Sequence, residues 1–236
     1  MIKSLAAIAF RVVLVLGVLV IGTSAMWAGP LVPCSTIATV GAWEAAGACI
    51  DESATYPNGD KIYTFNSNGT GTAIPTTWLF QVGDVTTSPT SSFHTITLQA
   101  PSTSGDLLGP GTYTLDYTIS INPSLPDYSQ QYIDSASVSM NVNSGSGSTD
   151  TKDLFNSQGT SIGVVESING ATATIGLPNE HSVGVDETIV LGTGAILASF
   201  TDGFNEQVVP EPASMALMGA GLLGLGTLLR RKRVAK

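Results

Sequence analysis

The segment between residues 29 and 209 has very little positive charge. It contains no arginine, and its only lysines are Lys61 and Lys152. All eighteen acidic residues of the chain lie between positions 44 and 211, so two lysines against eighteen acids give this span a net charge of −16, compared with −9 for the whole chain. An acidic surface repels nucleic acid and anionic lipid. We therefore expect no nucleic-acid partner.

Residues that commonly carry chemistry are also scarce. The two histidines, His94 and His181, lie far apart, and the sequence lacks the motifs of serine hydrolases, zinc proteases and phosphate-binding loops. His94 shares a strand face with Ile96 and Leu98, which predicts a half-buried strand residue rather than a metal ligand. These absences predict a protein that is not an enzyme.

Paired carboxylates are the remaining route to hydrolysis, because a glycoside hydrolase needs two of them across a cleft. Asp116 and Asp134 lie in or beside predicted strands and could in principle meet. With eighteen acids in one domain, some pair is expected by chance. A secreted hydrolase is therefore retained only as an alternative function.

The first 28 residues have the layout of a secretory signal peptide. Two positive charges flank the start, an apolar run extends from Val12 to Ile21, and small residues follow. We predict cleavage after Ala25 or after Ala28. An uncleaved signal anchor is the alternative.

The C-terminal tail has three parts in a fixed order. Pro210-Glu211-Pro212 come first, and the prolines keep the chain extended. Residues 213–229 carry no charge, and at ~1.5 Å per residue they predict a transmembrane helix at the short end of what spans a bilayer. Residues 230–236 are rich in positive charge and should stay cytoplasmic. The stop-transfer cluster consists of Arg230, Arg231, Lys232 and Arg233.

This ordered triple resembles the PEP-CTERM sorting signal of Gram-negative bacteria. The resemblance rests on Val209, Pro210, Glu211 and Pro212, on the Gly-rich apolar stretch and on the basic end. It implies an exported protein whose signal is read by exosortase, a membrane enzyme of bacteria that make exopolysaccharide or biofilm. A plain membrane anchor that is never processed is the alternative.

Export allows the two cysteines to be interpreted. Cys34 and Cys49 form an even pair in an oxidising compartment, which predicts a disulfide. Two cysteines without a nearby histidine lack the four ligands of a zinc site, and their spacing is not that of a redox motif. Residues 37–47, between the cysteines, could form a short helix held by the bridge.

The middle of the chain predicts many short strands. From Thr112 to Ile121 apolar and polar residues alternate without a fault, so one face should be buried and the other wet. Further strands are predicted at Lys61–Asn66, Trp78–Val82, Phe93–Ala100, Ser135–Val142, Ser161–Ile168, Ala171–Gly176, Glu187–Leu191 and Ala195–Thr201.

This pattern predicts an all-β fold, an antiparallel β-sandwich with jelly-roll-like topology, between an N-terminal signal helix and a C-terminal transmembrane helix. Asn169-Gly170 indicates a type I′ hairpin, and residues 144–150 a surface loop. The predicted parts are a signal peptide at 1–28, an extracytoplasmic domain at 29–204, and a sorting signal at 205–236 that begins with a short tether at 205–209.

No cofactor is expected, with calcium as the alternative. Calcium prefers carboxylate and amide oxygens, and the turns at 57–60 and 150–153 could supply some, although neither has EF-hand spacing. Exposed aromatics can stack on sugars, and Tyr128 and Tyr132 fall in a predicted loop.

These features predict an exported structural or adhesive protein of the cell surface or of the extracellular polysaccharide matrix. Its expected partners are an exosortase-type processing enzyme, the membrane before processing, and exopolysaccharide. A carbohydrate-binding module serving the same matrix is the alternative.

Overall fold

The fold is seen in a computed structural model that describes residues 31–52, 59–88, 90–101, 107–143 and 145–209. The predicted signal peptide, the tail helix and the stop-transfer residues lie outside these ranges. Within the ranges, no helix has both the length and the apolar character needed to cross a bilayer.

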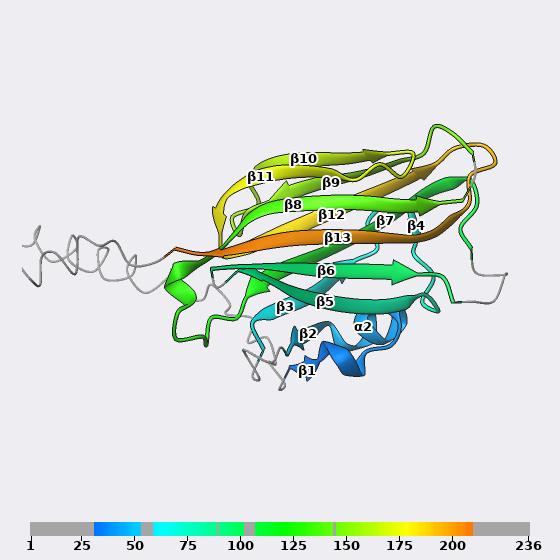
Figure 1. Cartoon of the computed structure of the whole chain (residues 1–236). Coiled ribbons are helices and arrows are strands. Elements are labelled where there is room, and N and C mark those ends of the chain that lie inside the picture. The colour runs from blue at the N-terminus through cyan, green and yellow to red at the C-terminus, as the bar shows by residue number, and fades with distance from the viewer. Residues whose placement is uncertain (1–30, 53–58, 89, 102–106, 144, 210–236) are drawn as a thin grey trace, which may run out of the picture. The chain divides into compact units, whose positions relative to one another are not determined.

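Two β-sheets form the domain (Figure 1). In spatial order, the first sheet contains β1 (Val32–Pro33), β2 (Ala48–Asp51), β3 (Lys61–Ser67), β7 (Gly111–Ile121), β12 (Ser182–Leu191), β9 (Thr149–Phe155) and β10 (Ser161–Ile168), with β4 (Thr72–Ala73) also paired to β7. The second sheet contains β11 (Ala173–Glu180), β8 (Gln131–Val142), β13 (Leu197–Val208), β6 (Ser91–Gln99) and β5 (Leu79–Ser88).

The strand order follows a jelly roll. From β6 to β13 the chain passes between the sheets so that β6-β13-β8-β11 lie in one and β7-β12-β9-β10 in the other. Among the described strands, only β1 with β2 and β4 with β7 pair in parallel. The predicted antiparallel β-sandwich is therefore confirmed.

The predicted short helix is present as α2 (Val40–Ala46). It begins after Thr39, whose side chain accepts a hydrogen bond from the backbone N–H of Ala42, and it ends at Gly47 with a φ of 72°. The disulfide between Cys34 and Cys49 is also confirmed, and it ties the short 3-10 turn η1 (Cys34–Thr36) to β2.

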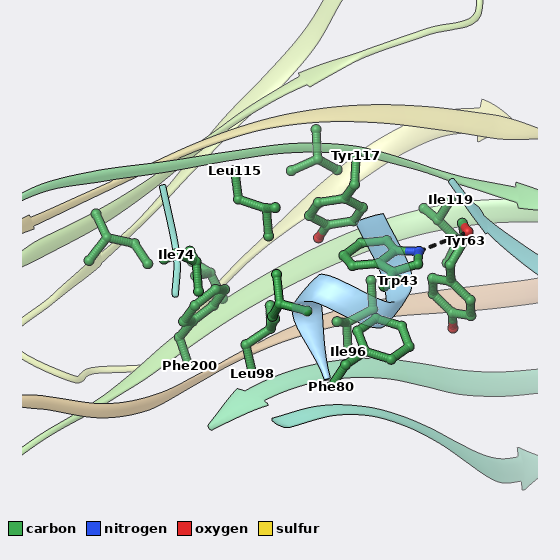
Figure 2. Packing of buried hydrophobic residues seen from close by; sticks show 14 of the residues in the cluster. Trp43, Tyr63, Ile74, Phe80, Ile96, Leu98, Leu115, Tyr117, Ile119 and Phe200 are labelled. Carbon is green, nitrogen blue, oxygen red and sulfur yellow. Dashed lines mark hydrogen bonds between the residues drawn. The ribbon is translucent and has the colours of Figure 1, made fainter. Parts of the chain in front are cut away.

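Trp43 places α2 in the hydrophobic core between the sheets. Its side chain is fully buried, and its Nε1–H donates to the carbonyl oxygen of Tyr63 at 3.2 Å (Figure 2). The indole packs against Phe80 and Tyr117, with ring centroids 4.5 and 5.9 Å away. The helix is thus held by an aromatic contact to both sheets as well as by the bridge.

Strand β9 corrects the prediction for residues 144–153. Residues 144–150 were predicted to be a surface loop and 150–153 a turn that could supply calcium ligands in the alternative, but Thr149–Phe155 is a strand between β12 and β10. Its inward positions hold Asp150, Lys152 and Leu154, all fully buried. Charged residues at inward positions hide the alternation that normally marks a strand.

Strand β13 corrects the predicted domain boundary at 204. It runs to Val208 as a middle strand of the second sheet, so residues 205–208 are not a tether. Glu206 within this stretch is buried. The folded domain therefore extends to the first residues of the predicted sorting signal.

The turn at Asn169-Gly170 has positive φ at both residues, 50° and 86°, as a type I′ turn requires. It does not close a hairpin, however, because β10 belongs to the first sheet and β11 to the second. The turn instead carries the chain from one layer of the sandwich to the other.

Candidate functional site

The predicted sorting residues follow directly on the folded domain. Val209 is the last described residue, and its backbone N–H donates to the carbonyl oxygen of Gln130 at 2.7 Å. Pro210, Glu211, Pro212 and the basic cluster at 230–233 lie outside the described residues. The Pro-Glu-Pro element thus begins two positions after the last residue of β13.

A first cluster of buried ionisable groups gathers at one end of β3, β6 and β13. We call it the Lys61 cluster; it consists of Asp51, Asp60, Lys61, Asp84, His94 and Glu206. Lys61 Nζ lies 2.5 Å from Glu206 Oε2 and 3.5 Å from Asp60 Oδ2. His94 Nε2 lies 3.2 Å from the same Glu206 oxygen.

His94 confirms the predicted face but not the predicted exposure. It lies on the same strand face as buried Ile96 and Leu98, but its own side chain is fully buried rather than half-buried. Its Nδ1 faces Asp84 Oδ1 at 3.7 Å and Asp51 Oδ2 at 4.0 Å. Among the described residues, none of these three atoms has a hydrogen-bond partner.

The pKa shifts differ between the rim of the Lys61 cluster, formed by Asp51 and Asp84, and its centre at Glu206. Burial, followed by the charge of Asp60, raises the pKa of Asp51 to about 6, and burial also raises the pKa of Asp84. Burial acts in the same direction on Glu206, but hydrogen bonding to His94 and the charge of Lys61 outweigh it and lower the pKa of that carboxyl. The centre is therefore a satisfied ion pair.

A pocket of about 700 Å³ opens beside this cluster. Asp51 and Asp84 line it together with Cys34, Phe80 and Val82. Asp51, Asp60 and His94 offer ligand atoms that all lie within 4.8 Å of one another, so these residues could hold a metal ion. A mixed imidazole and carboxylate set suits a transition metal or zinc better than calcium, which prefers oxygen alone.

A second cluster lies between the sheets, away from any pocket lining that the structure describes. We call it the Lys152 cluster; it consists of Tyr117, Asp150, Lys152, Glu187 and Asp202. Lys152 Nζ lies 2.6 Å from Asp202 Oδ1 and donates to the carbonyl oxygen of Ser137 at 3.0 Å. Asp202 accepts a hydrogen bond from the Tyr117 hydroxyl at 2.5 Å.

Glu187 and Asp150 complete the Lys152 cluster from the neighbouring strands. Glu187 is paired directly with Lys152 in the β12–β9 register, and both acids are almost fully buried. Burial, reinforced by the neighbouring carboxylates, raises the pKa of Glu187 well above its usual value and that of Asp150 to about 7. Both carboxyls therefore hold a proton more readily than an exposed acid does.

The other sequence candidates do not form a site. Asp116 alternates with inward Leu115 in the first sheet, and Asp134 follows inward Ile133 in the second, so these two carboxylates lie on opposite outer faces. They cannot flank one substrate bond.

Tyr128 and Tyr132 stack on a protein side chain rather than standing free. Their rings lie 4.3 and 4.7 Å from the ring of His181, and Tyr128 also packs against the core. The structure thus gives both tyrosines a packing role at the edge of the sandwich.

Comparison with known families decides the nature of the tail. Residues 208–233 match the family described as PEP-CTERM protein-sorting motif. The chain therefore carries a PEP-CTERM sorting motif. This motif marks an exported protein handled by exosortase, as the resemblance of the tail implied, and its first matched residue is the last residue of β13.

Among solved structures, the PEP-CTERM chain is similar to a pilus protein from work describing Bacillus endospore appendages as a novel family of disulfide-linked pili. The identity is 16%, the match covers 61% of this chain and 95% of that one, and the TM-score is 0.25. The enzymatically active domain of bacteriophage CBA120 tailspike protein 4 gives 8% identity, 55% and 19% coverage, and a TM-score of 0.22. Such scores support no functional argument. No curated protein matches the sequence.

The two buried clusters of this PEP-CTERM protein were missed in the sequence. Lys152, Glu187 and Asp202 each occupy a position whose neighbours two residues away include a buried apolar side chain, such as Leu154, Val185 or Phe204. A charged residue that falls in step with the inward-facing apolar positions of a strand is the signal that could have revealed them. Their mutual contact depends on strand pairing across two sheets, which the sequence does not display.

Proposed function

We propose that the protein is a non-catalytic structural or adhesive component of the cell surface or of the extracellular polysaccharide matrix, released from its membrane anchor by exosortase. The observation that carries this proposal is the sorting motif that begins where the last core strand ends. A signal placed directly after a folded domain delivers that domain as a whole to the outside.

The composition of the domain supports the proposal. The acidic sandwich repels anionic surfaces, and Asp116 and Asp134 lie on its opposite outer faces. A disulfide-linked β-domain suits a structural role outside the cell.

The test is the mature C-terminus, measured by intact mass and terminal peptide mapping of the protein from its own host. We expect a chain that ends near Pro210–Pro212 and is found in the surface or matrix fraction. A chain that still ends at Lys236 would show a permanent anchor instead. As a matched pair, Glu211→Ala should block processing, whereas Glu166→Gln, at an exposed acid inside the domain, should not.

The carbohydrate-binding alternative has a separate test. If Tyr128 and Tyr132 bind sugar, glycan-array binding should disappear in Tyr132→Ala. We expect no such binding, because both rings are engaged with His181.

A further inference from the structure

Both lysines of the domain are buried, which is unusual for this residue type. Lysine is almost never fully buried unless it is paired, yet Lys61 and Lys152 are both 0% exposed in a domain that has no other lysine and no arginine. Placing them on the acidic surface would have relieved charge repulsion there. Their position inside indicates a role for the amine within the core.

Lys152 and Asp202 connect the two sheets. Lys152 projects from β9 of the first sheet and Asp202 from β13 of the second, with Nζ 2.6 Å from Oδ1. The ammonium also lies 5.2 Å from the centre of the Phe204 ring. Since Oδ1 is one bond from the carboxyl carbon, the amine is held close to that carbon, and such proximity removes much of the entropic cost of a bimolecular encounter.

A proton carrier lies beside this pair. Glu187 is paired with Lys152 in the β12–β9 register and is almost fully buried, and burial, followed by the charges of Asp150 and Asp202, raises its pKa. The Tyr117 hydroxyl donates to the other oxygen, Oδ2, at 2.5 Å. The hydrogen bond from Tyr117 polarises the Asp202 carboxyl, and a dry site makes a neutral amine an effective nucleophile.

We propose that Lys152 and Asp202 form an intramolecular isopeptide bond, with Glu187 as the group that transfers the protons. A proton first passes from the Lys152 ammonium to the Asp202 carboxylate, which leaves a neutral amine and a neutral acid. The Nζ lone pair attacks Cγ, the Nζ–Cγ bond forms, and the Cγ–Oδ1 bond breaks. A second nitrogen proton travels through Glu187 to the departing oxygen, so one water leaves and Glu187 regains its starting state.

The remaining oxygen already has its partner. Oδ2 becomes the carbonyl oxygen of the new amide and stays hydrogen-bonded to Tyr117. The one proton left on Nζ can keep its hydrogen bond to the carbonyl oxygen of Ser137. The condensation of Lys152 with Asp202 requires no oxidant, metal or cofactor.

Trypsin tests the proposal directly, because Lys61 and Lys152 are its only sites in the domain. We expect the denatured full chain, after digestion, to give one fragment that runs from Ile62 past Lys152 through the rest of the domain, lighter by one water, about 18 Da. Separate unmodified fragments that end at Lys152 and begin at Asp153 would overturn the proposal.

Variants at the two acids define the chemistry. Asp202→Asn should form the same bond by losing ammonia, about 17 Da, whereas Asp202→Ala should give two fragments. Glu187→Gln should slow or abolish the cross-link, and Glu166→Gln, an exposed acid on the neighbouring strand, should leave it intact. If Glu187→Gln forms the bond as fast as the unaltered chain, the role of Glu187 is wrong. The unaltered chain alone decides whether the bond exists, even where a variant fails to fold.

Discussion

Lys61 and Lys152 occupy the same sandwich but differ in what surrounds them. Lys61 shares its carboxylates with His94, and the acids at its rim line an open pocket. Lys152 meets three carboxyl groups that are sealed between the sheets, with one cation among them. Burial acts to raise the pKa of both Glu206 and Glu187. At Glu206 the hydrogen bonds from His94 and Lys61 and their charges outweigh burial and lower the pKa, whereas at Glu187 they do not and the pKa is raised.

The comparison shows that burial alone does not decide the state of an ionisable group. Where several donors converge on one carboxylate, as on Glu206, the charged form persists as a salt bridge. Where burial and neighbouring carboxylates outweigh the donors, as at Glu187, the pKa of the acid is raised and acid–base chemistry becomes accessible inside the core. The balance of donors and acids distinguishes a structural ion pair from a reactive one.

Removing either lysine should have the largest effect on stability. Lys61→Met and Lys152→Met each leave a buried carboxyl without its cation, and we expect a loss of about 3–5 kcal/mol in the free energy of unfolding. Urea titration measures this loss. Lys61→Met should retain the Lys152–Asp202 cross-link, and its loss in that variant would erase the distinction between the clusters.

Removing the disulfide should affect the two clusters unequally. The bridge spans 15 positions, and replacing Cys34 and Cys49 with alanine should cost about 3 kcal/mol. Cys49 lies two residues before Asp51 on β2, so hydrogen exchange should increase around the Lys61 cluster. Exchange around β9 and Lys152 should change little; equal loosening of both would contradict the independence of the two sites.

The pH dependence of stability should sharpen the comparison further. The pKa of Asp51 is about 6 in the folded state against 3.8 in the unfolded state, so the folded protein binds more protons between these values. Stability from this group is complete at low pH and is lost as the pH rises from about 4 to 6. Over this pH range, the free energy of unfolding should fall by roughly 1–2 kcal/mol less in Asp51→Asn than in the unaltered protein, allowing for the partial exposure of Asp51.

Asp150→Asn provides the matched control in the other cluster, because the pKa of Asp150 is about 7. Its effect on the pH profile should extend to about pH 7 rather than ending near 6. Identical profiles for the two variants would show that their surroundings do not differ as described.

Tyr132→Ala supplies a reference outside both clusters and should have the smallest effect. Loss of its contact with His181 should cost about 0.5–1.5 kcal/mol, without change in the cross-link. Thermal unfolding measures the loss. A larger loss would mean that this edge stabilises more of the sandwich than its contacts indicate.

Much of the fold was predictable where one face of a strand is purely apolar. The strand at Thr112–Ile121 and the strand at Ser135–Val142 were found, and the disulfide and the short helix followed from the cysteines. Strand β9 and the end of β13 were missed, because Asp150, Lys152 and Glu206 occupy inward positions.

The clusters themselves could not be predicted in the same way. Lys152, Glu187 and Asp202 come from three strands in two sheets, and only the pairing of β9 with β12 and the stacking of the sheets bring them together. Local alternation indicates which face a residue occupies but not which distant residue it meets. A sorting motif, by contrast, is a local linear pattern, and it was identified from the sequence alone.

The place of β13 also has a mechanical consequence. This strand is flanked on both sides, by β6 and by β8, and its last residue is where the sorting motif begins. A force pulling on the C-terminal end would load both ladders lengthwise, so many backbone hydrogen bonds would have to fail together. An edge strand such as β5 would instead peel away one bond at a time. The sorting motif thus follows a strand that is well placed to resist a pulling force on the C-terminal end.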